Sequence, residues 1–187
     1  MKKTPADILK SAKIKAWSLR DSDHDCYDAT VVPESRNTGK NCVLVKSITE
    51  DVHEEPGDGF GHFKQVCGID EFRGKRIRMT AWAKSELPEG SLARLELCIV
   101  GDWGWWCKWN GTFDNLGRNP ITGTTDWKQY ALVVDVPQNG ISMSFGLLLA
   151  GTGKVWLDEF KFEIVDENTP LTGIGSRPEN LNFEDFV

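Results

Sequence analysis

Short runs of alternating hydrophobic and polar residues occupy most of the chain from about residue 40 onward. Side chains of a strand point alternately to its two faces, so this period predicts half-buried β-strands. The predicted strands are 41–47, 62–69, 75–84, 92–100, 127–136, 141–149 and 155–165, with two more at 14–19 and 27–31. Turn-forming Asn, Gly, Pro and Asp residues separate several of them. Many short strands without helices between them predict an all-β protein, an antiparallel β-sandwich.

The N-terminal segment has a different pattern. Residues 5–13, PADILKSAK, have a proline at an early position and predict a short helical segment of one or two turns. A chain of 187 residues suits one domain. We therefore expect a single sandwich over 1–187, with its core at about 14–165 and with 166–187 as an extended tail or a final strand.

Alternation also predicts which side chains face the core. Within three strands the apolar positions form one continuous set: Ile77, Met79, Ala81, Ala83, Leu95, Leu97, Ile99, Ile141, Met143, Phe145, Leu147 and Leu149. The opposite positions form a mixed set that includes Arg78, Trp82, Arg94 and Glu96. We interpret the mixed set as a polar and aromatic sheet face that holds a ligand. The alternative is an ordinary solvated face with one covered tryptophan.

Tryptophan is concentrated in GDWGWWCKWNGTFDN, residues 101–115, which holds four of the eight tryptophans of the chain. Indole rings offer flat apolar area to the C–H patches of sugar rings, while carboxylates, amides and guanidinium groups bond to vicinal hydroxyls. The candidate ligand-binding residues are Trp103, Trp105, Trp106, Trp109, Asp114 and Asn115 of this stretch, and Arg118 shortly after it. The alternative is a plug that closes one end of the sandwich, with Asp114 and Asn115 as turn formers.

Charge and cysteine content exclude several classes of protein. The net charge of −6 argues against binding to nucleic acid, which needs clustered Lys and Arg. Because the chain has neither a secretory signal nor an apolar run long enough to span a membrane, we expect no membrane partner and a cytoplasmic location. The five cysteines have no CxxC spacing, which argues against structural zinc, and we expect them to be reduced thiols.

The stretch DSDHDCYD, residues 21–28, begins with carboxylates at every second position, as calcium loops do. It departs from the EF-hand pattern, since Cys26 stands where that loop needs glycine. A structural calcium ion of another geometry is the one cofactor this pattern allows, with Asp21, Asp23, Asp25 and Asp158 as ligands. The alternative is a solvated acidic turn.

The chain carries none of the common catalytic motifs, so no catalytic residue is assigned and we do not expect an enzyme. Jelly-roll polysaccharide lyases use Arg, Lys and Tyr, and Arg78, Arg94 and Tyr130 are the residues here that such a reaction would need. Alternation, however, places Tyr130 on the core side with Leu132.

Three segments resemble known strands. FRGKRIRMTAWAKSE (72–86), TTDWKQYALVVDVP (124–137) and GTGKVWLDEFKFEIV (151–165) are similar to strands of bacterial jelly-roll modules of the galactose-binding-like group, including carbohydrate-binding modules of families 4, 9 and 22. Gln65 precedes the Gly74-Lys75 turn as a glutamine does in those modules. The resemblance implies a jelly-roll β-sandwich, adds Gln65 to the candidate ligand-binding residues, and implies a carbohydrate ligand.

Other segments resemble the group less simply. FDNLGRNPITGTTDWKQY (113–130) also looks like bacterial accessory domains of regulators and hydrolases, whose own ligand is unassigned. Family modules often open with an N-G-x-F-E strand that carries a calcium ligand. Here the similar NLNFED comes at 180–185, with Leu181 in place of the glycine, so that calcium site is not carried over.

Together these patterns predict a non-catalytic binding module for a carbohydrate or another small polar ligand. The alternative is an intracellular domain of a regulator that binds a protein partner or senses a small effector. A jelly-roll polysaccharide lyase is the third hypothesis.

Overall fold

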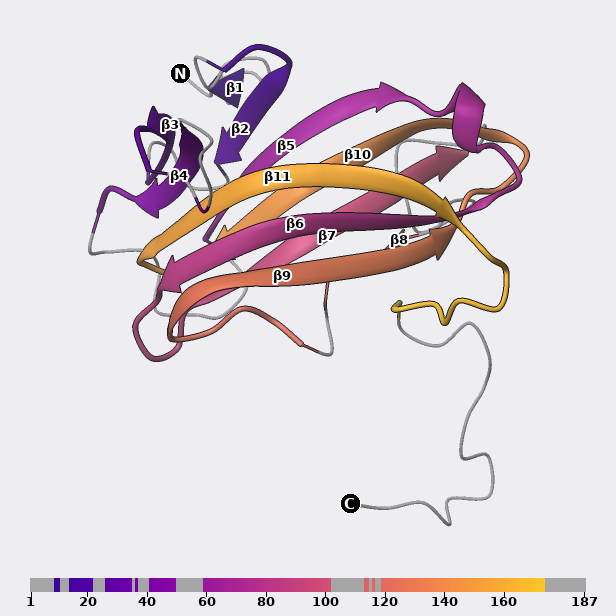
Figure 1. Ribbon diagram of the computed structural model, residues 1–187. Coiled ribbons are helices and arrows are strands. Elements are labelled where there is room, and N and C mark those ends of the chain that lie inside the picture. Colours follow the sequence, from indigo (N-terminus) through magenta and orange to yellow (C-terminus); the bar gives the residue numbers. More distant parts are fainter. Residues whose placement is uncertain are drawn as a thin grey trace, which may run out of the picture.

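The computed structural model describes residues 9–10, 14–21, 26–34, 36, 41–49, 59–101, 113–114, 116 and 119–173. These residues form two antiparallel sheets that pack face to face as two layers (Figure 1). Sheet A has the order β1 (Leu9–Lys10), β2 (Trp17–Asp21), β5 (Phe60–Gly68), β10 (Gly140–Ala150), β7 (Leu92–Gly101), β8 (Phe113–Asp114). Sheet B has the order β3 (Tyr27–Val32), β4 (Cys42–Ser47), β11 (Lys154–Val165), β6 (Arg76–Glu86), β9 (Thr124–Asp135). The predicted antiparallel sandwich is confirmed.

Strands that follow one another in sequence mostly lie in different sheets. From β4 to β7 the chain runs through sheets B, A, B and A in turn, and β9, β10 and β11 lie in B, A and B. The strands β5 and β6 are joined by the short 3-10 helix Asp70–Phe72. Because the chain crosses the sandwich at each of these steps, the outward positions of two consecutive strands face opposite sides of the molecule.

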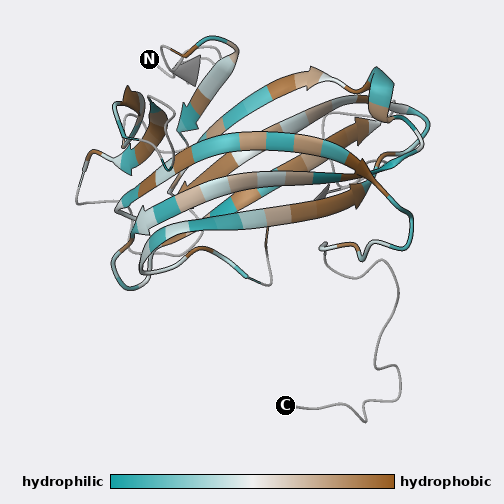
Figure 2. Cartoon of the chain, viewed as in Figure 1, coloured by the Kyte–Doolittle hydropathy of each residue, from teal (hydrophilic) through white to brown (hydrophobic). Residues whose placement is uncertain are grey.

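The core lies between the sheets, where the predicted alternation places it. Along β6 and β7, Ile77, Met79, Leu95 and Leu97 are fully buried. Figure 2 shows the resulting exchange of hydrophilic and hydrophobic positions along the strands. Burial of these apolar side chains provides the main driving force for the association of the two sheets.

An aromatic cluster fills one part of the core. The rings of Trp17 and Phe63 are stacked, with 4.6 Å between centroids and 6° between planes. Trp17 also contacts Phe145 and Phe160, and Phe145 meets Phe162 edge to face at 4.8 Å. The cluster joins β2, β5 and β10 of sheet A to β11 of sheet B, so it ties the two layers together.

A bulge interrupts β11 at the Leu157-Asp158-Glu159-Phe160 step. The register with β6 shifts between Asp158 and Lys161, and Glu159 has a φ of 51°, in the left-handed region. Such an extra length of strand re-aims the side chains that follow it. Here Phe160 and Phe162 are partly buried against the core.

The predicted N-terminal helix is wrong at its centre. Leu9 and Lys10 form β1, which pairs with Leu19 and Arg20 of β2. A helix of one or two turns is unstable by itself, whereas an edge strand gains backbone hydrogen bonds from a neighbour already in place. The other residues of 5–13 lie outside the described residues.

The chain that follows β11 returns toward β9. Residues 166–173 form turns and irregular backbone, and the amide of Thr172 donates to the carbonyl of Val133 at 3.2 Å. The amide of Val133 in turn donates to the Thr172 hydroxyl at 2.7 Å. The NLNFED segment lies outside the described residues, so the prediction of a tail or a final strand beyond residue 173 stays a prediction.

The cysteines are in part as expected. Cys26, Cys42 and Cys67 form no disulfide bond, whereas Cys98 is disulfide-bonded. The expectation that every cysteine is reduced is therefore wrong for Cys98. Spacing along the sequence carries no information on such a bond, because the fold alone sets the distance between the two Cα atoms.

The thiol of Cys42 gives a prediction about how its reactivity and the stability of the fold depend on pH. Burial, together with the negative charges of Glu34 and Asp158, raises the pKa of its thiol from 9.0 to about 11, against the opposing charge of Lys84. At pH 8 the thiolate fraction should then be about a hundredfold lower than for a free thiol, and alkylation correspondingly slow. Since the folded pKa lies above the unfolded one, this group stabilises the fold below pH 9.0 and loses that effect as pH rises toward 11.

The measurement is the rate of iodoacetamide labelling at Cys42, followed by mass spectrometry of the folded and the urea-unfolded chain. Equal labelling rates in the two states at pH 8 would contradict the shift. A stability curve from pH 8.5 to 11, compared with that of the Cys42→Ala variant, tests the sign, because the variant should lose less stability over this range.

Candidate functional site

The outward face of sheet A carries polar side chains in neighbouring rows. Opposite the core positions of four strands, the register sets Arg20, His62, Leu148 and Arg94 in one row and Ser18, Lys64, Gly146 and Glu96 in the next. Ser144 follows on β10, between Val66 and Cys98. We call Arg20, His62, Lys64, Arg94, Glu96 and Ser144 the polar face of sheet A.

A buried pair of side chains lies at the middle of this face. The His62 Nε2 and Glu96 Oε1 atoms are 3.2 Å apart, and each residue is only 9% exposed. His62 comes from β5 and Glu96 from β7, with β10 between them. Since Gly146 is the β10 neighbour of Glu96 and has no side chain, the strand between the pair leaves room for the two side chains to meet.

Several hydrogen-bonding atoms of this face are buried and unpaired. Among the residues that the structure describes, no hydrogen-bond partner is placed for His62 Nε2, Arg94 Nε or Ser144 Oγ. The Glu96 carboxylate is close enough to His62 for an ion pair but is not aligned for a hydrogen bond. A buried polar group left without a partner costs about 1–3 kcal/mol. Such groups are rare in folded proteins and call for a partner such as a ligand or water.

Positive charge predominates on the same face. Burial lowers the pKa of Lys64 below its usual range, Glu96 raises it and the nearby charge of Arg20 lowers it further. These effects show that the side chains of β2, β5 and β7 act on one another across the face. Counting the described residues, three cationic side chains therefore accompany a single carboxylate on this face, in a chain whose net charge is −6.

The outward face of sheet B is different, because the cations of β6 form ion pairs with other described residues. Arg36 lies over the Trp82 ring, 3.3 Å from its centroid, and pairs with Glu159 at 3.2 Å. Lys84 pairs with Glu34 at 2.7 Å and lies over the ring of Trp156. The segment that follows β3 thus covers Trp82 and the charged end of β6.

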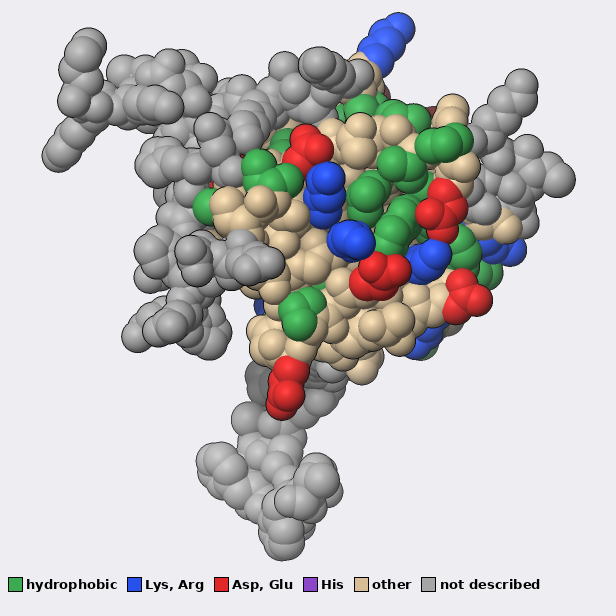
Figure 3. Space-filling model, turned by 90° about the vertical axis from the view of Figure 1, so that its left-hand side faces the viewer, with side chains coloured by type: hydrophobic (Ala, Val, Ile, Leu, Met, Phe, Trp, Pro, Cys, Tyr) green, Lys and Arg blue, Asp and Glu red, His purple; other side chains and the backbone are tan. Residues whose placement is uncertain are grey.

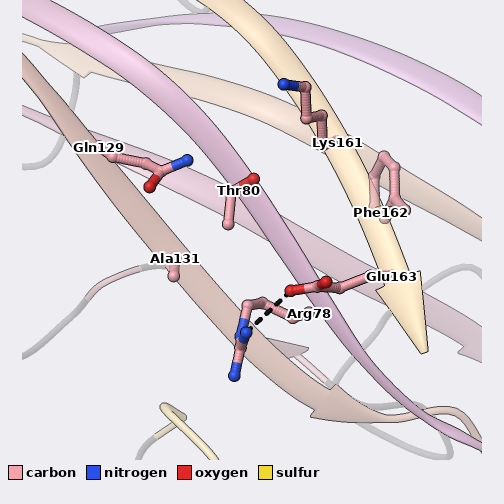
Figure 4. Close-up of a pocket in the computed structure, with 7 residues that line it drawn as sticks. All are labelled: Arg78, Thr80, Gln129, Ala131, Lys161, Phe162 and Glu163. Carbon is pink, nitrogen blue, oxygen red and sulfur yellow. Dashed lines mark hydrogen bonds and ion pairs between the residues drawn. The ribbon is translucent and has the colours of Figure 1, made fainter. Parts of the chain in front are cut away.

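A shallow hollow of about 650 Å³ lies on the same face of sheet B (Figure 4). Its lining side chains come from β6, β9 and β11: Arg78, Thr80, Gln129, Ala131, Lys161, Phe162 and Glu163. Arg78 and Glu163 form an ion pair of 2.8 Å across it. Figure 3 shows the molecule from the left-hand side of Figure 1, where Lys and Arg side chains lie among Asp, Glu and hydrophobic ones. The hollow on sheet B therefore offers polar groups that are already paired or solvated.

Comparison with known proteins begins with the families. No protein-family model matches the chain. The uncharacterized HTH-type transcriptional regulator YbfP of Bacillus subtilis (strain 168) is 33% identical over 186 residues. The match covers 92% of this chain, which spans 58% of that regulator's length.

Solved structures agree on the architecture. The C-terminal family 22 carbohydrate-binding module of Clostridium thermocellum Xyn10B superposes with a TM-score of 0.55 and 13% identity, over 83% of this chain and 92% of that one. The chain has the jelly-roll fold of these modules. The enzymatically active domain of tailspike protein 4 of bacteriophage CBA120 superposes on this jelly-roll domain with a TM-score of 0.62 and 16% identity, over 82% of this chain and 20% of that one.

The jelly-roll domain separates residues that the sequence analysis grouped. Arg78 and Trp82 belong to β6 of sheet B, whereas Arg94 and Glu96 belong to β7 of sheet A. The expectation that they share one sheet face is wrong, because the chain crosses the sandwich between the two strands. Only Arg94 and Glu96 lie on the polar face of sheet A.

Of the other predicted ligand-binding residues, the structure describes Gln65 and the backbone of Asp114. Gln65 lies on β5 on the same side as Phe63 and is half-buried, so it does not join His62 and Lys64. Asp114 lies in β8, where its backbone pairs with that of Leu97 of β7. The remaining members of the tryptophan stretch lie outside the described residues, and their role stays a prediction: Trp103, Trp105, Trp106, Trp109, Asn115 and Arg118.

Four residues of the polar face of sheet A are not among the ligand-binding residues predicted from the sequence, namely Arg20, His62, Lys64 and Ser144. A signal was present, since His62 and Lys64 alternate with Phe63 in a predicted strand, and Ser144 alternates with Phe145. What the sequence does not contain is the register that brings His62 of β5 to Glu96 of β7.

The predicted calcium ligands divide between the two sheets. Asp21 ends β2 and is buried, where its carboxylate accepts the backbone N–H of Tyr27 at 2.9 Å. Asp158 lies on β11, and Asp23 and Asp25 are outside the described residues. Within the described part of the chain, no three His, Cys, Asp or Glu side chains are grouped to hold a metal. The calcium ion stays a prediction.

Within the same described ranges, the chain contains no helix of the length and apolar character that crossing a membrane requires.

Proposed function

We propose that this jelly-roll domain is a non-catalytic binding module that holds a carbohydrate against the polar face of sheet A. The observation that carries the proposal is the cluster of polar side chains there, in which His62 Nε2, Arg94 Nε and Ser144 Oγ have no hydrogen-bond partner among the described residues. A sugar hydroxyl both donates and accepts, so it can satisfy donors and acceptors that lie side by side. Glu96 adds a carboxylate that accepts hydroxyl hydrogen bonds.

Two further observations support this surface rather than the hollow on sheet B. The polar groups of sheet A are held by four adjacent strands, which fixes their positions before a ligand arrives. The hollow on sheet B is lined by Arg78 and Glu163, which already neutralise one another. The fold adds support, since a family 22 carbohydrate-binding module shares it.

The test is calorimetric titration of the domain with a panel of soluble xylo-, gluco-, galacto- and uronic-acid oligosaccharides. We expect saturable binding of one sugar class. The Ser144→Ala variant should bind that sugar about three- to tenfold more weakly, because a neutral hydrogen bond contributes about 0.5–1.5 kcal/mol.

Thr80→Ala, in the hollow on sheet B, is the matched control and should leave the affinity unchanged. An affinity that falls with Thr80→Ala and not with Ser144→Ala would move the site to sheet B and contradict the proposal. Rising ultraviolet absorbance with uronic-acid polymers would reveal a lyase and contradict the non-catalytic role.

A second candidate function follows from the relative that is a regulator. Identity of 33% over 186 residues to an HTH-type transcriptional regulator favours a sensory role, in which a small effector occupies the same polar face. The two candidates differ in the ligand and not in the site. The sensor would be favoured if no sugar of the panel binds and a small metabolite gives a saturable rise in Tm that Ser144→Ala abolishes.

A further inference from the structure

Within the described part of the chain, the cations of β6 on the outward face of sheet B are paired, and those on the polar face of sheet A are not. On β6, Arg76 pairs with Asp135 at 2.7 Å, Arg78 with Glu163 and Lys84 with Glu34. Over the residues that the structure describes, Arg20, Lys64 and Arg94 form no ion pair. Among the described residues, the cations of β6 are therefore neutralised and those of the polar face of sheet A are not.

The carboxylate of Glu96 does not neutralise these three cations. Among the described residues it is the only carboxylate of the polar face of sheet A, and one of its oxygen atoms lies 3.2 Å from His62 Nε2. One carboxylate shared among an imidazole and three cationic side chains leaves an excess of positive charge.

Burial makes this excess costly. Lys64 is half-buried, and its lowered pKa has burial as the main cause. Arg94 is also partly buried, and its Nε atom has no hydrogen-bond partner among the described residues. Partly buried charges without counterions are unfavourable, and a bound anion would remove the penalty while forming charge-assisted hydrogen bonds.

We infer that the sugar bound at this site is acidic, with a carboxylate or a phosphate whose oxygens contact Lys64 and Arg94. This inference rests on the proposed function and names the class of its ligand. Lys64 pairs with Gly146 across the sheet and Arg94 pairs with the next outward residue of β10, Leu148. The two cations thus lie diagonally across β10, Lys64 beside Gly146, which has no side chain, and Arg94 beside Leu148. Ser144 and Glu96 remain for the hydroxyl groups of the same sugar.

The experiment compares acidic sugars with their neutral parents by calorimetry: galacturonate and glucuronate oligosaccharides against galacto- and gluco-oligosaccharides, with glucose 6-phosphate and inorganic phosphate as further probes. We expect one acidic sugar to bind at least about tenfold more tightly than its neutral parent, the factor that a single charge-assisted contact provides. A preference for the uronate identifies a carboxylate ligand, and a preference for the sugar phosphate identifies a phosphate ligand.

Single substitutions test which side chains cause the preference for the acidic sugar. Lys64→Gln should reduce the preference for the acidic sugar severalfold and leave binding of the neutral parent almost unchanged. Arg94→Gln should weaken binding of both sugars and the acidic one more strongly, because Arg94 also bonds to hydroxyl groups. Arg78→Gln on sheet B is the matched control and should alter neither affinity. Should Arg94→Gln fail to fold, ionic strength tests the wild-type chain, since raising NaCl from about 50 mM to about 500 mM should weaken only the acidic sugar.

Failure of the inference and failure of the proposed function give different results. Equal binding of acidic and neutral sugars overturns the inference and leaves the carbohydrate site in place. Inorganic phosphate binding as tightly as any acidic sugar also overturns it, because the site would then recognise an anion alone. Absence of binding by every sugar in the panel overturns both.

Discussion

Replacing Phe63 by alanine should lower the free energy of unfolding by about 3–5 kcal/mol. Its side chain is 1% exposed and stacks on Trp17 with 4.6 Å between ring centroids. Removing the ring leaves a cavity where β2 and β5 meet β11, and it removes an aromatic contact as well as buried apolar area. The measurement is urea unfolding followed by far-ultraviolet circular dichroism.

Val66 on the same strand provides the control for this prediction. It is 57% exposed and points away from the core, so Val66→Ala should change stability by less than about 0.5 kcal/mol. A loss below about 1.5 kcal/mol for Phe63→Ala would mean that the neighbouring rings close the cavity and that the cluster does not hold the sheets together.

The same strand also supports the candidate site. His62 and Lys64 flank Phe63 and point to the other side of sheet A. Anchoring of Phe63 in the core therefore fixes the strand on which the two polar side chains stand. Partial loss of the core should loosen the site before it unfolds the domain.

Local patterns in the sequence were sufficient to find the long strands. The period of two in 75–84, 92–100 and 141–149 is visible without any knowledge of neighbours, and β6, β7 and β10 begin and end within two residues of these bounds. The two-residue strands β1 and β8 were missed, because they exist only through pairing with a neighbour and show no period of their own.

Assignment of strands to sheets was not available from the same patterns. Arg78 and Arg94 both occupy outward positions, and nothing in either strand tells that β6 and β7 lie in different layers. Equally, His62 and Glu96 meet across β10, a strand that comes much later in the sequence than either of them. Register across a sheet depends on the whole fold, so the site could be predicted only as separate residues.

Replacing Gly146 by alanine should lower the free energy of unfolding by about 1–3 kcal/mol and weaken ligand binding more than tenfold. A Cβ atom at this position would meet the backbone of β5, at the Phe63 carbonyl oxygen and, at 2.8 Å, the Lys64 Cα. Backbone atoms inside a ladder cannot move aside as a flexible side chain can, so β5 and β10 must separate or shift. Urea unfolding and calorimetric titration of the same sample measure both effects.

Gly68 near the end of the same strand pair is the matched control. A Cβ atom there would have nothing within 4 Å, so Gly68→Ala should leave stability and binding close to those of the wild type. The Gly146→Ala substitution should reduce ligand affinity more than stability. A shift of β5 against β10 displaces His62 and Lys64 relative to Glu96 even where the backbone hydrogen bonds of the ladder remain. A Gly146→Ala variant that loses stability but keeps full affinity would show that the ligand does not depend on this register, and would place it elsewhere on the domain.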